Sequence, residues 1–364
     1  MLRSLAILAV ALTSGFPFIG FGKLQGSPAG AVDPQAGNSP SELRLLVEPN
    51  YLPDSVTDLF EKETGIHVQK ETAPFDVNVL GSMLAAHGFY DLVIIDDWAV
   101  SALVHEKKLE PINHASIPNL KNIAPELLDQ SFDPGNLYSV PYLGGVLGIA
   151  VNTDLVKSKI RDFPDVFRPE FDHKACLVDD APVTLARIAR RSMGNPSEGA
   201  LTEKDLETIS PLVSKWLSRA KVLDTENLVP LFQSGKVALG IVWSGQAAEL
   251  LNADKKFRWI LPSSPTRVYI DSFVIPKQAG HQEAAEAFIN FVLRPEIGKM
   301  IAEAEPYLSP NVAARSLLSK KTLGNPASYP DMEQIKRIAD PADNGVERLM
   351  LGRWFQSLQD KPQP

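Results

Sequence analysis

Residues 131–152, SFDPGNLYSVPYLGGVLGIAVN, constrain the fold of this 364-residue chain more than any other stretch. A polar turn at Asp133–Asn136 leads into a short strand-like segment, and after Gly144 and Gly145 an apolar run continues to Asn152. Such punctuation by turn residues and glycines predicts a strand, a flexible joint and a second strand. The pattern is typical of a chain that leaves one lobe and enters another, and function is then expected in a cleft between two lobes.

The N-terminus predicts export. Arg3 precedes a short apolar core at Leu5–Leu12, which is the pattern of a signal peptide. Pro17 and neighbouring glycines argue against a membrane-spanning helix, although a retained membrane anchor remains the alternative. We therefore expect a signal peptide or export segment over residues 1–30, followed by a Gly-, Ser- and Pro-rich linker over residues 31–41.

Composition narrows the class of partner. The chain is 44% hydrophobic and 22% charged, as in ordinary soluble globular proteins, and its length allows two domains. Its formal net charge of −8 disfavours nucleic acid and anionic membranes and is weakly permissive of cationic ligands. The one cysteine, Cys176, excludes a disulfide framework and lies far from the signal, so a non-lipidated protein is expected.

Strands and helices are predicted to alternate in the first part of the chain. Leu43–Val47 is expected to be a strand, and the helix after it is expected to end at Gly65. Ile66–Gln69 is a second predicted strand, and Met83–His87 is expected to end a second helix. The continuous apolar run Asp91–Ile95 is typical of a parallel strand covered on both faces. This order predicts an open, doubly wound α/β lobe.

The alternation resumes after residue 152. Cys176–Val178 and Val237–Trp243 are predicted strands, and Thr202–Asp205 has the pattern of a capping box that opens a helix. Phe257–Leu261 and Val268–Ile275 are strands expected to carry the chain back to the first lobe. Further helices are predicted over residues 184–193, 282–293, 295–304 and 344–358.

The fold class expected is therefore α/β with two lobes. Each lobe has an open, mostly parallel sheet flanked by helices, and two crossover strands join the lobes. Lobe 1 is expected to comprise residues 42–146 and 272–315, and lobe 2 residues 147–271 and 316–364. The crossovers near Gly144–Gly148 and Asp271–Ile275 would serve as hinges.

Acidic and aromatic side chains recur where the predicted strands end, and ligands bind at these ends in open α/β sheets. Carboxylates pair with ammonium groups, and aromatic rings enclose methylenes and attract cations, so this combination suits an organic cation. Simpler interpretations remain open, because Asp96 and Asp180 can cap helices and Trp243 can be core. The strand-end residues are Glu48, Tyr51, Asp96, Trp98, Asp180, Trp243, Tyr269 and Asp271.

Several motifs, in order and with matching spacing, give a family resemblance over about residues 43–358. They are FEKETGI (60–66), YDLV (90–93), SFDPGNLYSVPY (131–142), GIVWSG (240–245), YIDSFVIP (269–276), INFVLRPE (289–296) and YLSPNVAAR (307–315). The chain resembles the spermidine/putrescine-binding proteins, the solute-binding subunits of polyamine ABC importers. By position, Asp180 falls where the family holds an amine of the ligand, and other cleft positions fall on Tyr51, Asp96, Trp98, Trp243, Tyr269, Asp271 and Tyr307.

The chain departs from the family pattern at several cleft positions. Glu48 stands where a tryptophan is usual, Asp96 replaces a small hydroxyl residue, and Tyr269 replaces a tryptophan. An acid three residues after Asp180 is here Val183. Acids are both lost and gained, so the resemblance still implies a cationic ligand, but the sequence does not fix its length or the spacing of its charges.

The resemblance implies a periplasmic, monomeric binding protein that delivers putrescine or spermidine to the permease and ATPase of an ABC importer. It implies no enzyme activity, cofactor or metal, and the chain lacks G-x-S-x-G, P-loop and H-E-x-x-H motifs. Another amino-containing solute (an opine, a betaine or an ω-amino acid) is the alternative, with Arg267 as candidate partner for its carboxylate. A carboxylate-based hydrolase is the candidate from another class.

Overall fold

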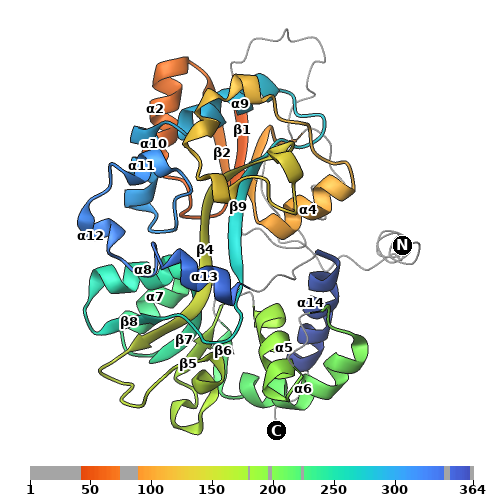
Figure 1. Ribbon diagram of the computed structural model, residues 1–364, viewed down its shortest axis with the longest axis vertical. Coiled ribbons are helices and arrows are strands. Elements are labelled where there is room, and N and C mark those ends of the chain that lie inside the picture. Colours follow the sequence, from red (N-terminus) through yellow and green to blue (C-terminus); the bar gives the residue numbers. More distant parts are fainter. Residues whose placement is uncertain are drawn as a thin grey trace, which may run out of the picture. The chain divides into compact units, whose positions relative to one another are not determined.

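The computed structural model describes residues 42–73, 89–178, 181–195, 199–222, 225–339 and 345–360. Within this part of the chain, nine strands follow the order β2-β1-β3-β9-β4-β7-β5-β6, with β8 paired to β4. Figure 1 labels the elements along the chain. The strands are β1 (Glu42–Val47), β2 (His67–Thr72), β3 (Leu92–Ile95), β4 (Ser139–Asn152), β5 (Ala175–Leu177), β6 (Ala220–Val222), β7 (Leu239–Trp243), β8 (Phe257–Ile260) and β9 (Val268–Val274).

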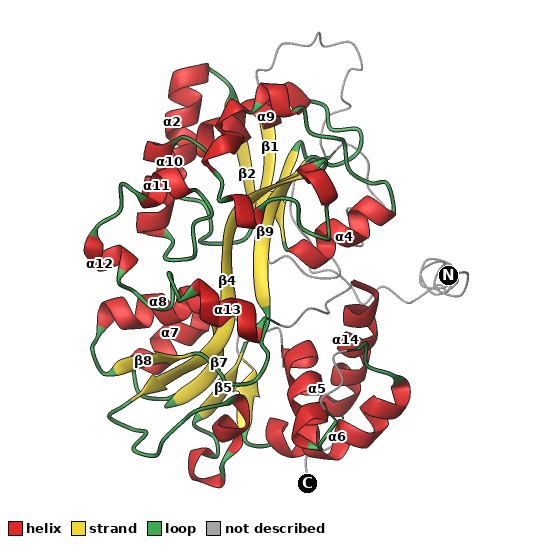
Figure 2. Ribbon diagram, in the orientation of Figure 1, coloured by secondary structure: helices red, strands yellow, loops and turns green. Residues whose placement is uncertain are grey.

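Helices flank the strands in both lobes (Figure 2). Short 3-10 helices cover His114–Ser116, Pro118–Asn122, Pro125–Leu127, Pro134–Asn136, Phe163–Phe167 and Pro169–Phe171. The α-helices are α2 (Asp54–Thr64), α4 (Asp97–His105), α5 (Ala181–Ser192), α6 (Glu203–Leu217), α7 (Thr225–Gln233), α8 (Ser244–Ala253), α9 (Gln282–Val292), α10 (Pro295–Ala304), α11 (Val312–Arg315), α12 (Lys320–Leu323), α13 (Met332–Ile338) and α14 (Gly345–Gln359).

The first lobe contains the parallel trio β2-β1-β3. Strand β3 is buried on both faces, as predicted for the apolar run that ends at Ile95: Leu92 packs into one hydrophobic cluster and Val93 into another. Helix α2 buries Val56 and Phe60 and ends at Gly65, whose φ of 73° is the left-handed conformation that glycine adopts most easily. Local sequence signals therefore predict the ends of β1 at Val47 and β3 at Ile95 correctly, whereas β2 extends to Thr72, three residues beyond its predicted end at Gln69.

Strands β4 and β9 are the two crossovers, and they run antiparallel side by side (Figure 1). The first half of β4 pairs with β9, and the second half pairs with β7 and β8. The predicted lobe crossing is confirmed, but the predicted interruption at Gly144–Gly145 is wrong, since β4 is one continuous strand. The glycines reflect close approach: a Cβ at Gly145 would lie 2.5 Å from Ser244 Oγ and 2.6 Å from the Tyr269 hydroxyl.

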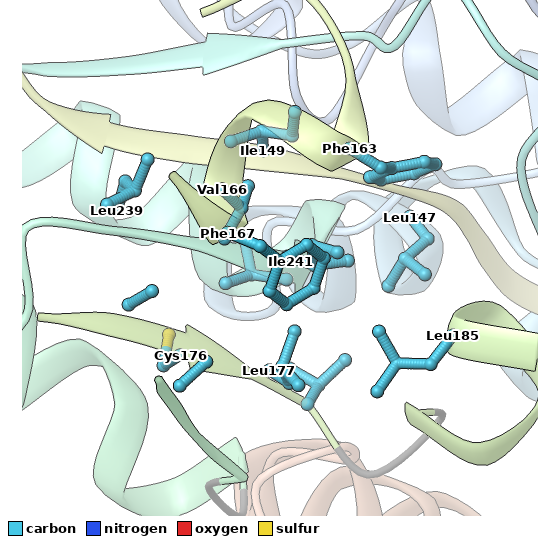
Figure 3. Close-up of a cluster of buried hydrophobic side chains, with 14 of the residues drawn as sticks. Leu147, Ile149, Phe163, Val166, Phe167, Cys176, Leu177, Leu185, Leu239 and Ile241 are labelled. Atoms are coloured by element: carbon cyan, nitrogen blue, oxygen red, sulfur yellow. The ribbon is translucent and has the colours of Figure 1, made fainter. Parts of the chain in front are cut away.

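The second lobe repeats the arrangement, with β7-β5-β6 in parallel. Its core includes Phe163, Phe167 and Leu177, and Cys176 is a buried free thiol within it (Figure 3). The predicted capping box opens α6: Thr202 Oγ1 accepts from the Asp205 amide at 3.2 Å, and the Asp205 carboxylate accepts from the Thr202 amide at 2.8 Å. Helix α14 packs on α5 and α6 and also contacts α4.

Some predictions fall on residues outside the described ranges. These are the export segment over residues 1–30, the linker over residues 31–41 and the helix end at Met83–His87. No helix among the described residues is long and apolar enough to cross a membrane. The residue boundaries of the two lobes remain predictions.

Candidate functional site

A hydrogen bond between Tyr51 and Asp271 joins the loop between β1 and α2 to the middle of β9. The Tyr51 hydroxyl donates to the Asp271 carboxylate, and the Tyr142 hydroxyl donates to the Tyr51 carbonyl oxygen at 2.7 Å. Tyr51 is 4% exposed and its ring meets Tyr142 edge to face, with centroids 5.6 Å apart. A buried phenol thus holds a carboxylate on a crossover strand in a fixed position.

Tyr307 links this pair to the second lobe. Its ring meets Tyr51 edge to face at 5.0 Å, and its hydroxyl accepts a hydrogen bond from Gln246 Nε2 at 2.8 Å. Gln246 lies in the first turn of α8, next to Gly245. A Cβ at Gly245 would overlap the Tyr307 ring, so only glycine leaves the ring in this position. One tyrosine therefore contacts residues of both lobes.

Trp243 and Tyr269 form a second aromatic pair, at the end of β7 and the start of β9. Their ring centroids lie 4.9 Å apart at an interplanar angle of 71°. Tyr269 is opposite Gly145 in the β4–β9 ladder, and it is 6% exposed. In strand β9, alternation places Tyr269 and Asp271 on one face, as predicted. The aromatic pair and the carboxylate consequently share that face of the crossover.

Burial and negative charge shift the pKa values of the site. Burial is the main cause that raises the pKa of Asp271 to about 7, although the Tyr51 hydrogen bond and the Arg267 charge act in the opposite direction. Burial, and after it the charge of Glu48, raises the pKa of the Tyr307 hydroxyl. Glu48, which follows β1, therefore contributes negative potential at these rings. A cation would be favoured at such a position.

Two further acids were not predicted from the sequence. Glu249 lies on α8 one turn after Gln246, and Glu305 follows α10 two residues before Tyr307. Burial, followed by the charge of Glu249, raises the pKa of Glu305 to about 7, while Lys70 acts in the opposite direction. The helical spacing of Gln246 and Glu249 was visible in the sequence, but nothing there indicated that α8 faces Tyr307.

Asp96 and Asp97 are engaged by an arginine of the same chain. Arg267 Nη2 lies 2.5 Å from Asp96 Oδ1, and Arg267 Nη1 lies 3.1 Å from Asp97 Oδ2. Asp96 precedes α4 without a side-chain capping bond, so the simpler capping interpretation is not what fixes it. Burial raises the pKa of Asp96 well above its ordinary value, although Arg267 opposes this.

The remaining predicted residues have other surroundings. Trp98 is 5% exposed within the hydrophobic cluster that contains Val93, and the Arg348 guanidinium lies 5.3 Å from its ring centroid. Asp180 lies outside the described residues. The structure thus brings together Tyr51, Trp243, Tyr269, Asp271 and Tyr307, with Glu48 in electrostatic range. Within the described residues, no group of three or more His, Cys, Asp or Glu side chains could hold a metal ion.

Comparison with known proteins gives consistent relatives. Residues 56–332 match the family model described as "Bacterial extracellular solute-binding protein". The spermidine/putrescine-binding periplasmic proteins of Salmonella typhimurium and of Escherichia coli K12 are each 31% identical over 311 residues, covering 85% of this chain and 89% of the relative.

A solved structure has the same fold. It is the spermidine/putrescine ABC transporter substrate-binding protein of Streptococcus pneumoniae, with a TM-score of 0.73 and 28% sequence identity over 88% of this chain and 98% of that chain. The two crossover strands and the helices after β7 and β3 lie within the span matched by the family model, whereas Glu48 and Tyr51 precede it.

Proposed function

This chain belongs to the bacterial extracellular solute-binding proteins, in the spermidine/putrescine-binding family, and we propose that it captures a polyamine between its two lobes and delivers it to an ABC importer. The observation that carries the proposal is the Asp271 carboxylate on the face of β9 that also presents Tyr269, with Tyr51 hydrogen-bonded to it. An anionic group among aromatic rings is the chemistry that recognises an ammonium group on a methylene chain.

We assign roles by chemistry. Asp271 pairs with one ammonium group, and the rings of Tyr51, Trp243, Tyr269 and Tyr307 enclose the adjacent methylenes. Glu48 adds negative potential, which supports cation binding because its charge already shifts the Tyr307 hydroxyl. Asp180, Asp96 and Trp98 stay predictions for the remaining ligand positions. A ligand that bridges both lobes stabilises their closed arrangement.

The structure supports a polyamine over an amino acid or a related zwitterion. A ligand carboxylate needs a cationic partner, and Arg267 was the candidate. The Arg267 guanidinium forms salt bridges with Asp96 and Asp97, so a ligand carboxylate would have to compete with two carboxylates of the protein. Turnover by paired carboxylates lacks support, because the relatives reported above are named as binding proteins.

The remaining parts of the proposal concern the setting of the protein. We expect export to the periplasm as a non-lipidated monomer, with the permease and ATPase of an importer as partners and no nucleic acid bound. The N-terminal signal pattern, the net charge of −8 and the position of Cys176 support this setting. Mass spectrometry of the mature protein tests the cleaved and unlipidated state directly.

Titration calorimetry with putrescine and spermidine tests the proposed ligand site. In the Asp271→Asn variant, a buried ammonium loses its charge partner, which costs about 3–5 kcal/mol, or roughly a hundredfold to several thousandfold in Kd. Asp254→Asn is the matched control. Asp254 is an exposed carboxylate just after α8 that accepts the backbone N–H of Lys256 and pairs with its ammonium group. An Asp271→Asn affinity within about threefold of the parent protein would refute the site.

A further inference from the structure

Arg267 lies at the edge of the candidate site as a fixed internal cation. Its side chain is 10% exposed, and its guanidinium contacts the carboxylates of Asp96 and Asp97. The Asp97 carboxylate also accepts the backbone N–H of Ile270 at 3.4 Å, between Tyr269 and Asp271 in the sequence. A planar guanidinium that reaches two carboxylates at once is held more firmly than an ammonium would be.

The charge of this cation reaches the candidate site. Arg267 directly precedes β9, two residues before Tyr269 and four before Asp271. Burial raises the pKa of Asp271, the charge of Asp97 raises it further, and the charge of Arg267 lowers it against both effects. The ion pairs of Arg267 with Asp96 and Asp97 therefore lie within electrostatic range of the carboxyl group that is proposed to bind the ligand.

We propose that Arg267 determines ligand length, by occupying the carboxylates that a further ammonium group of a longer polyamine would need. The proposal rests on the proposed function. A short diamine places one end at Asp271 and leaves Arg267 in place. A triamine or tetramine that extends toward α4 must displace the guanidinium or place an ammonium beside it, and like charges in a buried site repel strongly. The chain consequently prefers a short diamine.

A purely structural role makes a different prediction. If Arg267 only tied α4 to β9, its loss would weaken the fold and reduce the affinity for every amine by a similar factor. A length-determining role changes the ratio of affinities between long and short amines, because only the long amines need the carboxylates of Asp96 and Asp97. The ratio of Kd values therefore distinguishes the two roles, whatever the effect on stability.

The first experiment uses the parent protein and needs no variant. Calorimetry with putrescine, spermidine and spermine should give a Kd for putrescine at least tenfold lower than the Kd for spermine. If spermine binds as tightly as putrescine, the length assignment is wrong while the polyamine function stands. If none of the three amines binds, the proposed function itself fails.

The second experiment changes the cation. Arg267→Gln keeps amide N–H donors near Asp97 but removes the charge, and it should shift the putrescine-to-spermidine Kd ratio at least tenfold toward spermidine. Arg267→Lys keeps the charge and should leave the ratio near that of the parent protein. Arg294→Gln is the matched control, since Arg294 pairs with Glu63 at 2.7 Å outside the site. An unchanged ratio in folded Arg267→Gln protein would overturn the proposal.

Discussion

Polyamine affinity should fall as the pH is lowered from 8 to 6, because the carboxyl group proposed to bind the ligand titrates in this range. Burial raises the pKa of Asp271 to about 7 in the ligand-free protein. Putrescine remains doubly protonated throughout, so the change in affinity reports the protein side of the pair. The ammonium group binds the carboxylate and gains little from the neutral acid, and each proton that Asp271 takes up competes with the ligand.

The magnitude follows from the pKa. With a pKa of about 7, roughly nine-tenths of Asp271 is ionised at pH 8 and roughly one-tenth at pH 6. The apparent Kd should therefore rise about tenfold across this interval, which corresponds to about 1.4 kcal/mol. Glu305 titrates near the same pH, so the Glu305→Gln variant is needed to show how much of the change belongs to each carboxyl.

Titration calorimetry at several pH values, in buffers with different enthalpies of ionisation, measures both the Kd and the number of protons released on binding. Asp271→Asn should bind more weakly and lose most of the pH dependence, because an amide does not titrate in this range. A parent-protein Kd that is the same at pH 6 and pH 8 within twofold would refute the assignment of Asp271 as the ammonium partner.

The same shift affects the stability of the ligand-free protein, with a sign that can be worked out. The folded-state pKa of Asp271 lies above its ordinary value of 3.8, so the folded state holds this proton more tightly than the unfolded state does. The corresponding stabilisation is complete below about pH 3.8 and is lost as the pH rises through about 7. Without ligand, the carboxylate form of Asp271 is a cost to the folded protein, and a bound ammonium group offsets it.

Two substitutions test packing and capping. Gly245→Ala should displace the Tyr307 ring and raise the putrescine Kd, measured by calorimetry, at least tenfold. Gly352 has open space around it, so Gly352→Ala should leave the putrescine Kd unchanged. The same Kd in Gly245→Ala and Gly352→Ala would contradict the packing argument. Thr202→Ala should lower the free energy of unfolding in urea by about 1 kcal/mol, with Thr208→Ala as a nearly neutral control, and a loss no larger than the control's would contradict the capping role.

Local patterns predicted the elements that depend on neighbours in sequence. The helix after Pro53 ends at Gly65, and the Thr202 capping box opens α6, because each signal acts within four residues. Strands such as Leu92–Ile95 were predicted from their unbroken apolar character, which reflects burial on both faces. These features specify the elements of each lobe, and the strand ends then indicate where a ligand would lie.

The Gly144–Gly145 pair shows why the sequence alone was misleading at the crossover. Two adjacent glycines permit a flexible joint, and they equally permit close approach of other chain segments. In the structure the second reason applies, since Ser244 and Tyr269 occupy the space that a side chain at Gly145 would need. Those two residues follow Gly145 by 99 and 124 positions in the sequence, so the reason for the glycines is tertiary and no local pattern contains it.

The residues of the candidate site likewise fall into those that local rules predicted and those that only tertiary packing brings together. Trp243, Tyr269 and Asp271 were predicted because strand ends and strand alternation place them, and both rules act within one element. Gln246 and Glu305 were missed because their relevance is tertiary: Gln246 donates to the Tyr307 hydroxyl, and Glu305 is affected by the charge of Glu249 on α8. The pairing of Arg267 with Asp96 spans 171 positions, so the sequence showed two charges without showing that they meet.

Asp97, which contacts β9, and Asp271, which is part of it, differ in how well the protein compensates the burial of their charge. The Asp97 pKa is raised by burial, but the Arg267 charge and hydrogen bond outweigh this and lower it below its ordinary value, so Asp97 is anionic with its charge already compensated. Asp271 is hydrogen-bonded to a neutral phenol, and its pKa stays raised at about 7. A cation therefore gains more beside Asp271 than beside Asp97, because at Asp271 it relieves a desolvation cost that the protein has left largely uncompensated. The net charge of the sequence could not show this difference, since each of the two aspartates contributes one negative charge to it.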